Sequence, residues 1–212
     1  MRPLGKKLPK QPKIKRAVSP GYYSVRLPKT QTMLIKCRLG FPGRSTSLWY
    51  DAKIGNTIFG GGALYSKLGE AIRVKGGYAY SPFSYGENNI LSGSWCVYFA
   101  TENGKLLQAN KVLDELMVHF STSVRKQDLP VAKAAARRRA LFGQISNLRQ
   151  LEAMTSLYLK GLPLKLFKFD AGRIQGVDEV GISAFYQHFF DPRAFVTVTV
   201  GAEELPGSEV IH

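Results

Sequence analysis

The sequence predicts an α+β domain, in which paired helices pack on one face of a mostly antiparallel β-sheet. Three observations predict this class. Short β-favouring runs occur near the start, in the middle and near the end of the chain. Groups of segments with a helical period of apolar residues lie between those runs. Hydrophobic residues at 44% and charged residues at 21% of the 212 are typical of a globular domain with its own core.

The first predicted elements are a strand and a helix. Residues 32–41, with the sequence TMLIKCRLGF, form an apolar β-favouring run that predicts a strand. Ser47 is a candidate N-cap for a helix over 48–59. The three glycines at 60–62 are predicted to end this helix and form a helix–helix turn, because no phosphate-loop motif surrounds them.

A second helix and a hairpin follow. Apolar residues spaced by four predict a helix from Ala63 that ends at Gly76 and Gly77. A strand over 78–85, a turn over 86–89 and a returning strand over 91–100 then form a predicted β-hairpin.

Helical signals dominate the second half of the chain. A long amphipathic helix follows residue 101, with Thr101 or Asn103 as its expected N-cap. A helix is predicted from about Asp128, with Pro130 in its first turn. Two more helices are predicted over 145–159 and 178–190, and a final strand over 195–200.

The charge of the chain is uneven. The formal net charge is +15, and seven basic residues without any acid lie within residues 1–16, where three prolines interrupt them. We therefore expect a basic, Pro-rich tail or linker over 1–29 that is flexible at 1–16, one domain over 30–205, and a short tail over 206–212. The chain shows neither the apolar stretch of a secretory signal nor one long enough to span a membrane. We expect a soluble protein, and the sequence does not indicate in which cellular compartment it resides.

Cysteines and histidines give no metal signal. Cys37 and Cys96 lie in predicted strands, so they are either two small buried residues or a disulfide. The histidines are His119, His188 and His212, which are too far apart to share a helix face at the spacing of zinc ligands. We therefore expect neither a metal nor another cofactor in this chain.

Three stretches together resemble one protein family. They are the glycines 60–62 followed by Ser66 and Leu68, the run Arg73-Val-Lys-Gly-Gly-Tyr-Ala-Tyr80, and Val196–Gly201 followed by Glu203-Glu-Leu. These stretches resemble the zinc-free, C-terminal-type domain of the insulinase/pitrilysin zinc metallopeptidases. Val74 and Tyr78 depart from the family's Arg-Glu-Lys-x-Gly-Leu-Ala-Tyr, in which glutamate and leucine stand at these places.

The resemblance implies both a fold and a role. The fold would be that of one insulinase/pitrilysin or mitochondrial processing peptidase domain over residues 30–202. Arg73 and Tyr80 would bind peptide substrate and stabilise the oxyanion of a metalloendopeptidase. A zinc-bearing homologous domain or subunit would supply the metal. The chain lacks the family's His-x-x-Glu-His motif, so the resemblance implies no activity for the chain alone.

The chemistry of Arg73 and Tyr80 agrees with that role. Arg73 lies in the last turn of a predicted helix and Tyr80 early in the next strand, so the chain reversal places both donors on one side. A fixed guanidinium and a phenol O–H are suitable donors for an oxyanion. Without the resemblance, a helix-end arginine and a tyrosine on a sheet face would explain the same residues.

Other functional classes stay open. The chain is alternatively a non-catalytic core protein that kept the peptidase fold, as in the respiratory cytochrome bc complex, and a homodimer is possible. A nucleic-acid-binding module is the least favoured alternative. The basic run Arg137-Arg138-Arg139, with Lys133 and Arg149 nearby, would point in several directions on a helix rather than form one groove.

Overall fold

Six strands form one continuous sheet over the part of the chain that the computed structural model describes, residues 19–88, 93–122, 124, 126–167 and 171–211. The strands are β1 (Gly21–Arg26), β2 (Gln31–Leu39), β3 (Phe83–Asn88), β4 (Gly93–Glu102), β5 (Val196–Gly201) and β6 (Glu209–Val210). Their order across the sheet is β3-β4-β2-β5-β1-β6. β2 is antiparallel to β4 and β5, and β3 to β4, whereas β1 is parallel to β5 and β6. The predicted, mostly antiparallel sheet is confirmed.

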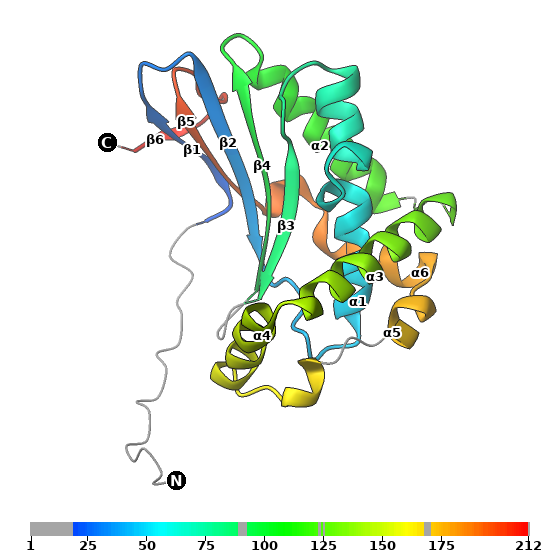
Figure 1. Ribbon diagram of the computed structural model, residues 1–212. Coiled ribbons are helices and arrows are strands. Elements are labelled where there is room, and N and C mark those ends of the chain that lie inside the picture. The colour runs from blue at the N-terminus through cyan, green and yellow to red at the C-terminus, as the bar shows by residue number, and fades with distance from the viewer. Residues whose placement is uncertain (1–18, 89–92, 123, 125, 168–170, 212) are drawn as a thin grey trace, which may run out of the picture.

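The helices cover one face of this sheet (Figure 1). The α-helices are α1 (Leu48–Asn56), α2 (Leu106–Thr122), α3 (Leu129–Ile145), α4 (Asn147–Leu159), α5 (Ala171–Gly176) and α6 (Glu179–Phe189). Shorter helical segments are η1 (Thr57–Gly61), η2 (Ala63–Tyr65), η3 (Gly69–Lys75), η4 (Lys126–Asp128), η5 (Leu164–Phe167) and η6 (Pro192–Ala194). The α+β class with helices on one face is therefore confirmed.

Aromatic side chains fill the core between β4 and the helices. Trp95, Val97 and Phe99 alternate along β4 and are fully buried on its helix-facing side. The Trp95 ring lies 4.8 Å from that of Phe190, which follows α6. Asn56 joins the end of α1 to this core, because its side-chain oxygen accepts the Trp95 indole N–H at 2.6 Å. The buried amide is thus satisfied where helix and sheet meet.

The core is more polar beneath β1, β2 and β5. Ser24, Lys36, Thr197 and Thr199 are all buried on the helix-facing side of these strands. The Lys36 ammonium group forms an ion pair with Asp114, which α2 carries above the strands. Threonine and valine alternate along β5, and here the threonines point inward while the valines lie on the face without helices. An apolar–polar alternation thus predicts a strand without telling which set is buried.

Both predicted tails contribute strands to the sheet. Residues 21–26 fall within the segment expected to be tail or linker, but they form β1 between β5 and β6. Residues 209–210, expected to be tail, form β6. The pairing partners of β1 lie at the other end of the chain, so no local hairpin signal marks it. The expected flexibility of residues 1–16 lies outside the described residues and stays a prediction.

The helix that begins with α1 ends within the glycines at 60–62 as predicted, at Gly61 with Gly62 as its C-cap, two residues later than the expected end at residue 59. α1 continues without a break into η1, whose wider π-helical turns include Gly60 and Gly61. A Cβ atom at Gly60 would lie 2.8 Å from the backbone nitrogen of Ser84, so this glycine lets the helix contact β3 directly. Ser47 occupies the N-cap position of α1 as predicted, but its side chain makes no cap hydrogen bond.

Several other boundaries differ from prediction. The expected helix from Ala63 is split into η2 and η3, although it ends at Gly76 as predicted. The expected turn over 86–89 is wrong at 86–88, which belong to β3, and residue 89 lies outside the described residues. The predicted helices near 128, 145–159 and 178–190 and the final strand are confirmed as α3, α4, α6 and β5, within two residues at each start.

The two cysteines form a disulfide. Cys37 of β2 and Cys96 of β4 are directly opposite each other in the antiparallel pair, with their Cα atoms 4.2 Å apart. Neighbouring positions across two strands bring cysteines within bonding range. The structure thereby decides between the two states that the sequence leaves open.

Candidate functional site

Arg73 and Tyr80 belong to one chain reversal at the edge of the sheet. Arg73 lies in η3, and Tyr80 lies in the connection between η3 and β3. The helical segment stops at Gly76 and Gly77, and Gly77 has a φ of +59°, which glycine adopts without strain. The predicted reversal therefore brings the two side chains together, although Tyr80 precedes the strand in which it was expected.

The two side chains are stacked on each other. The Cζ atom of Arg73 lies 4.1 Å from the centre of the Tyr80 ring, which is a cation–π contact. Tyr80 is 76% exposed, so the pair stands at the protein surface. Both residues line a cavity of about 200 Å³ together with Leu64, Gly69, Ser81, Pro82 and Phe83.

The donors of this pair are available to a ligand. Within the part of the chain that the structure describes, no hydrogen bond engages the Arg73 guanidinium or the Tyr80 hydroxyl. Stacking uses the face of the guanidinium plane, so the in-plane N–H groups of Arg73 can still donate. The pair therefore offers several donors, one of them charged, to an anionic or carbonyl oxygen.

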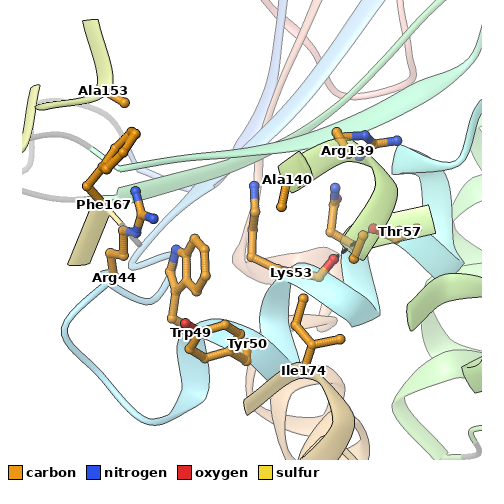
Figure 2. A pocket seen from close by; sticks show the side chains of 12 residues that line it. Arg44, Trp49, Tyr50, Lys53, Thr57, Arg139, Ala140, Ala153, Phe167 and Ile174 are labelled. Carbon is orange, nitrogen blue, oxygen red and sulfur yellow. Dashed lines mark hydrogen bonds between the residues drawn. The ribbon is translucent and has the colours of Figure 1, made fainter. Parts of the chain in front are cut away.

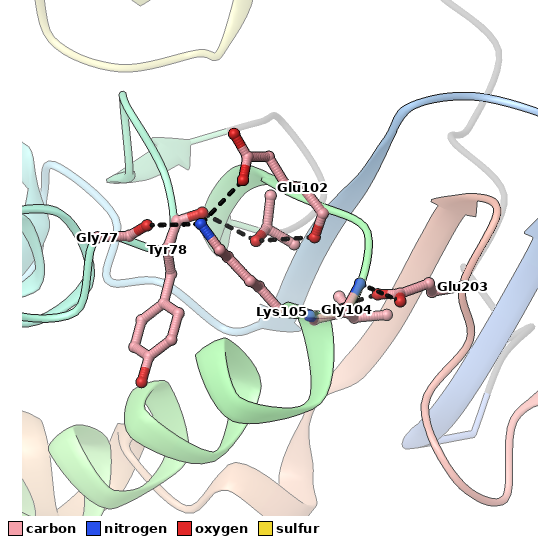
Figure 3. Close-up of polar contacts among 8 residues, drawn as sticks. Gly77, Tyr78, Glu102, Gly104, Lys105 and Glu203 are labelled. Atoms are coloured by element: carbon pink, nitrogen blue, oxygen red, sulfur yellow. Dashed lines mark hydrogen bonds and ion pairs between the residues drawn. The ribbon is translucent and has the colours of Figure 1, made fainter.

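A polar network holds the segment between Arg73 and Tyr80 against the sheet (Figure 3). The Lys105 ammonium donates to the Gly77 carbonyl at 3.5 Å and forms an ion pair with Glu102 at 2.8 Å. The Thr101 hydroxyl donates to the Tyr78 carbonyl at 2.8 Å. An isolated antiparallel bridge between Ala79 and Thr101 fixes the next residue. Three contacts, at Gly77, Tyr78 and Ala79, therefore orient the backbone that carries Tyr80.

The same network shows what caps α2. The Glu203 carboxylate, which follows β5, accepts hydrogen bonds from the N–H groups of Gly104 and Leu106. Thr101 is instead part of β4, and Asn103 donates to the Lys29 carbonyl, so neither performs its predicted capping role. The contacts of Lys105, Thr101 and Glu203 with Gly77, Tyr78 and Gly104 were not predicted, because these partners are distant in the chain.

The strand after Tyr80 lies at an edge of the sheet. β3 pairs with β4 on one side and is the last strand on the other. Phe83, its first residue, belongs to the Arg73–Tyr80 cavity and packs against Tyr98 of β4, with ring centres 5.1 Å apart. Phe83 therefore belongs both to the cavity wall and to the face of the sheet. An edge strand offers unpaired backbone groups to an extended peptide.

Zinc does not fit the residues present. His119 on α2 and His188 on α6 are exposed and contact the rings of Phe120 and Phe189. Over the residues that the structure describes, no three or more His, Cys, Asp or Glu side chains gather in a group able to hold a metal ion. His212 lies outside those residues.

The basic run on α3 does not form one patch. All three arginines are exposed, but only Arg139 donates to the Gly61 carbonyl, at 3.0 Å, and lines a separate cavity with Arg44 and Lys53. As expected from helix geometry, consecutive arginines point in different directions. None of the helices in the described ranges is both long enough and apolar enough to cross a bilayer.

Comparison with known proteins identifies the domain type. A family model described as the peptidase M16 inactive domain matches residues 3–136. A peptidase M16 inactive domain from Pseudomonas fluorescens superposes with a TM-score of 0.72 at 20% identity, covering 97% of this chain and 49% of that one. A protease from Helicobacter pylori gives 0.76 at 12% identity, covering 93% and 48%. No curated protein matches the chain in sequence.

A further solved structure has the extent of a single domain. An inactive peptidase domain from Bordetella parapertussis superposes with a TM-score of 0.71 at 14% identity, covering 82% of this chain and 95% of that one. The chain thus spans about half the length of the two larger proteins and most of the smaller one. With well over half of the chain matched by the family model, the resemblance is confirmed: the chain belongs to the inactive-domain family of the M16, or insulinase/pitrilysin, peptidases.

Proposed function

We propose that this domain binds peptide substrate and stabilises the oxyanion of peptide hydrolysis through Arg73 and Tyr80, while a zinc-bearing homologous domain or subunit supplies the metal. The observation that carries this proposal is the stacked pair at the mouth of a cavity beside the edge strand β3. Membership of the inactive-domain family supports the division of labour between two domains.

The position of the pair favours a peptide as the ligand. An extended peptide can add to the free edge of β3 through main-chain hydrogen bonds. Its carbonyl groups would then pass the cavity in which Arg73 and Tyr80 end. Because three contacts, with Thr101 of β4 and with Lys105 just before α2, fix the Gly77–Ala79 backbone, the donors need little reorganisation when a peptide binds.

The pair would contribute mainly to the rate of the reaction. A tetrahedral intermediate places negative charge on the former carbonyl oxygen, and the donors bind that charge more strongly than they bind the neutral carbonyl. Loss of one such donor typically lowers kcat about 100- to 1000-fold. Losing a donor that binds substrate and transition state equally would raise KM instead.

The test uses the complex of the full chain with its His-x-x-Glu-His-bearing partner. Tyr80→Phe deletes the hydroxyl and keeps the ring under Arg73, and Arg73→Ala deletes the cation. Both variants should lower kcat strongly and change KM little. Tyr158→Phe on exposed α4 and Arg138→Gln on α3 are the matched controls, and they should leave both parameters unchanged.

The scaffold alternative makes the opposite prediction. If Arg73→Ala and Tyr80→Phe assemble with the partner and cleave peptide at the wild-type rate, the pair is structural and the chain acts as a core protein. Size-exclusion chromatography of each variant with the partner separates loss of assembly from loss of turnover.

A further inference from the structure

A second cavity lies away from Arg73 and Tyr80, between α1 and the helices α3, α4 and α5 (Figure 2). Its volume is about 280 Å³, and it is open to solvent. Arg44 precedes α1, Lys53 lies on α1, and Arg139 lies on α3, and all three contribute to its lining. We call it the cation pocket.

Two of the three cations are arranged around one indole ring. The Cζ atom of Arg44 lies 5.3 Å from the centre of the Trp49 ring, and the Lys53 Nζ atom lies 5.6 Å from the same centre. Figure 2 shows Trp49 between Arg44 and Lys53. The ring therefore fixes both positive groups in one part of the pocket.

The charges of the cation pocket are not balanced within the described chain. No aspartate or glutamate is among the residues that line it, and none forms an ion pair with Arg44, Lys53 or Arg139 in the described ranges. Desolvation of the ammonium group by surrounding protein atoms lowers the pKa of Lys53, and repulsion from Arg139 and Arg44 lowers it further. An anion in the pocket would relieve this repulsion.

The rest of the lining is apolar or aromatic. Tyr50 and Ile174 lie on one side of the pocket, and Phe167 of η5 and Ala153 of α4 on another. A volume of about 280 Å³ lies just below the range for ligand sites, which is roughly 300–1,000 Å³, and suits a small ligand with one ring. Such a site combines an apolar surface with a few convergent charged groups.

We propose that the cation pocket binds a small organic anion, in which a phosphate or carboxylate group is carried on a planar apolar ring. The anionic group would contact Lys53, and the guanidinium groups of Arg44 and Arg139, which lie on either side of it, would attract the negative charge. The ring would pack against Trp49 and Phe167. This site is separate from the proposed peptide chemistry, and its occupation is tested without any peptidase partner.

Tryptophan fluorescence of the full chain provides the measurement. The chain contains two tryptophans, and Trp95 is fully buried in the core while Trp49 lines the pocket. Phenyl phosphate and phenylacetate are the test ligands. 2-Phenylethanol lacks the charge, and inorganic phosphate lacks the ring. Calorimetry gives the stoichiometry and affinity of each, at an ionic strength of about 0.15 M that screens the positive surface.

Phenyl phosphate, phenylacetate or both should bind once per chain, more tightly than 2-phenylethanol and inorganic phosphate do. Whichever of phenyl phosphate and phenylacetate binds more tightly shows whether the pocket prefers a phosphate or a carboxylate group. Lys53→Met keeps the side-chain stem and should weaken this binding about tenfold or more. Arg138→Gln removes the same formal charge from the residue preceding Arg139 and should leave the affinity unchanged.

Three results would overturn the proposal. The first is that neither ring-bearing anion binds. The second is that inorganic phosphate binds as tightly as phenyl phosphate, which removes the role of the apolar wall. The third is equal weakening by Lys53→Met and Arg138→Gln, which indicates attraction by net charge alone. Trp49→Phe should abolish the fluorescence change if the ligand lies in the cation pocket.

Discussion

The Lys36 ammonium group is fully shielded from water, whereas Asp114, its ion-pair partner, is 24% exposed. The two ends of this ion pair are therefore not equivalent. Removal of Asp114 leaves a cation inside the protein, while removal of Lys36 leaves a carboxylate that still reaches water. We predict that Asp114→Ala lowers the free energy of unfolding by about 3–5 kcal/mol, and that Lys36→Met costs much less.

The loss of unfolding free energy caused by Asp114→Ala should be smaller at alkaline pH. Burial lowers the pKa of Lys36 below its ordinary 10.5, against the attraction of Asp114. Between the folded and unfolded pKa values the unfolded chain holds a proton that the native chain has released, so stability rises with pH. Without the attraction of Asp114, the pKa of Lys36 in the folded chain is lower still, so the rise in stability begins at a lower pH. Urea unfolding at neutral and alkaline pH measures the effect, and equal costs for both variants would refute the asymmetry.

Reduction of the Cys37–Cys96 disulfide should destabilise the fold. The bond closes a sequence separation of 59 residues, and a native disulfide of this kind typically contributes about 2–4 kcal/mol. We expect the denaturant midpoint to fall in the presence of a reductant. The double variant Cys37→Ala/Cys96→Ala should not respond to the reductant. A wild-type midpoint that is insensitive to reduction would mean that the two thiols do not pair in solution.

Replacement of Gly60 should disturb the contact between η1 and β3. A Cβ atom there would lie 2.8 Å from the backbone nitrogen of Ser84, which cannot move without the strand. Gly60→Ala should cost about 1–3 kcal/mol of stability. Gly176→Ala is the control, because its Cβ atom would meet no atom within 4 Å. Thermal unfolding compares the two, and equal melting temperatures would contradict this role of Gly60.

The isolated chain should hold no stoichiometric zinc after dialysis. His119 and His188 lie on different helices, and the cysteines are paired with each other. Zinc sites need three or four suitable ligands at short range. Elemental analysis of the dialysed protein checks this expectation. One tightly held zinc ion per chain would reverse the proposed division of labour between the two domains.

Local patterns in the sequence predicted most of the fold. Leu113 and Met117 on α2 repeat at the helical period, and both are fully buried as that period implies. The strand β1 escaped prediction because its hydrogen-bonding partners, β5 and β6, lie at the far end of the chain. A pairing over such a distance leaves no mark in the residues nearby.

The site was predictable to a different extent. Arg73 and Tyr80 lie close together in the sequence on either side of one chain reversal, so their approach follows from local structure. Arg44, Lys53 and Arg139 converge through the packing of α1 against α3, which no spacing within the sequence reveals. Arg139 was grouped with its neighbours in the basic run, yet the rotation of about 100° per residue directs it elsewhere.

The placement of β1 bears on how the protein is made. In the described sheet, β1 pairs with β5 and β6 alone, and β5 also lies between β1 and β2. A ribosome releases residues 21–26 long before residues 196–201 exist. The first strand must therefore wait without its partners while the intervening residues are made, and the sheet can close only after β5 has been synthesised. Chaperones that shield such a segment would act on the nascent chain before the domain is complete.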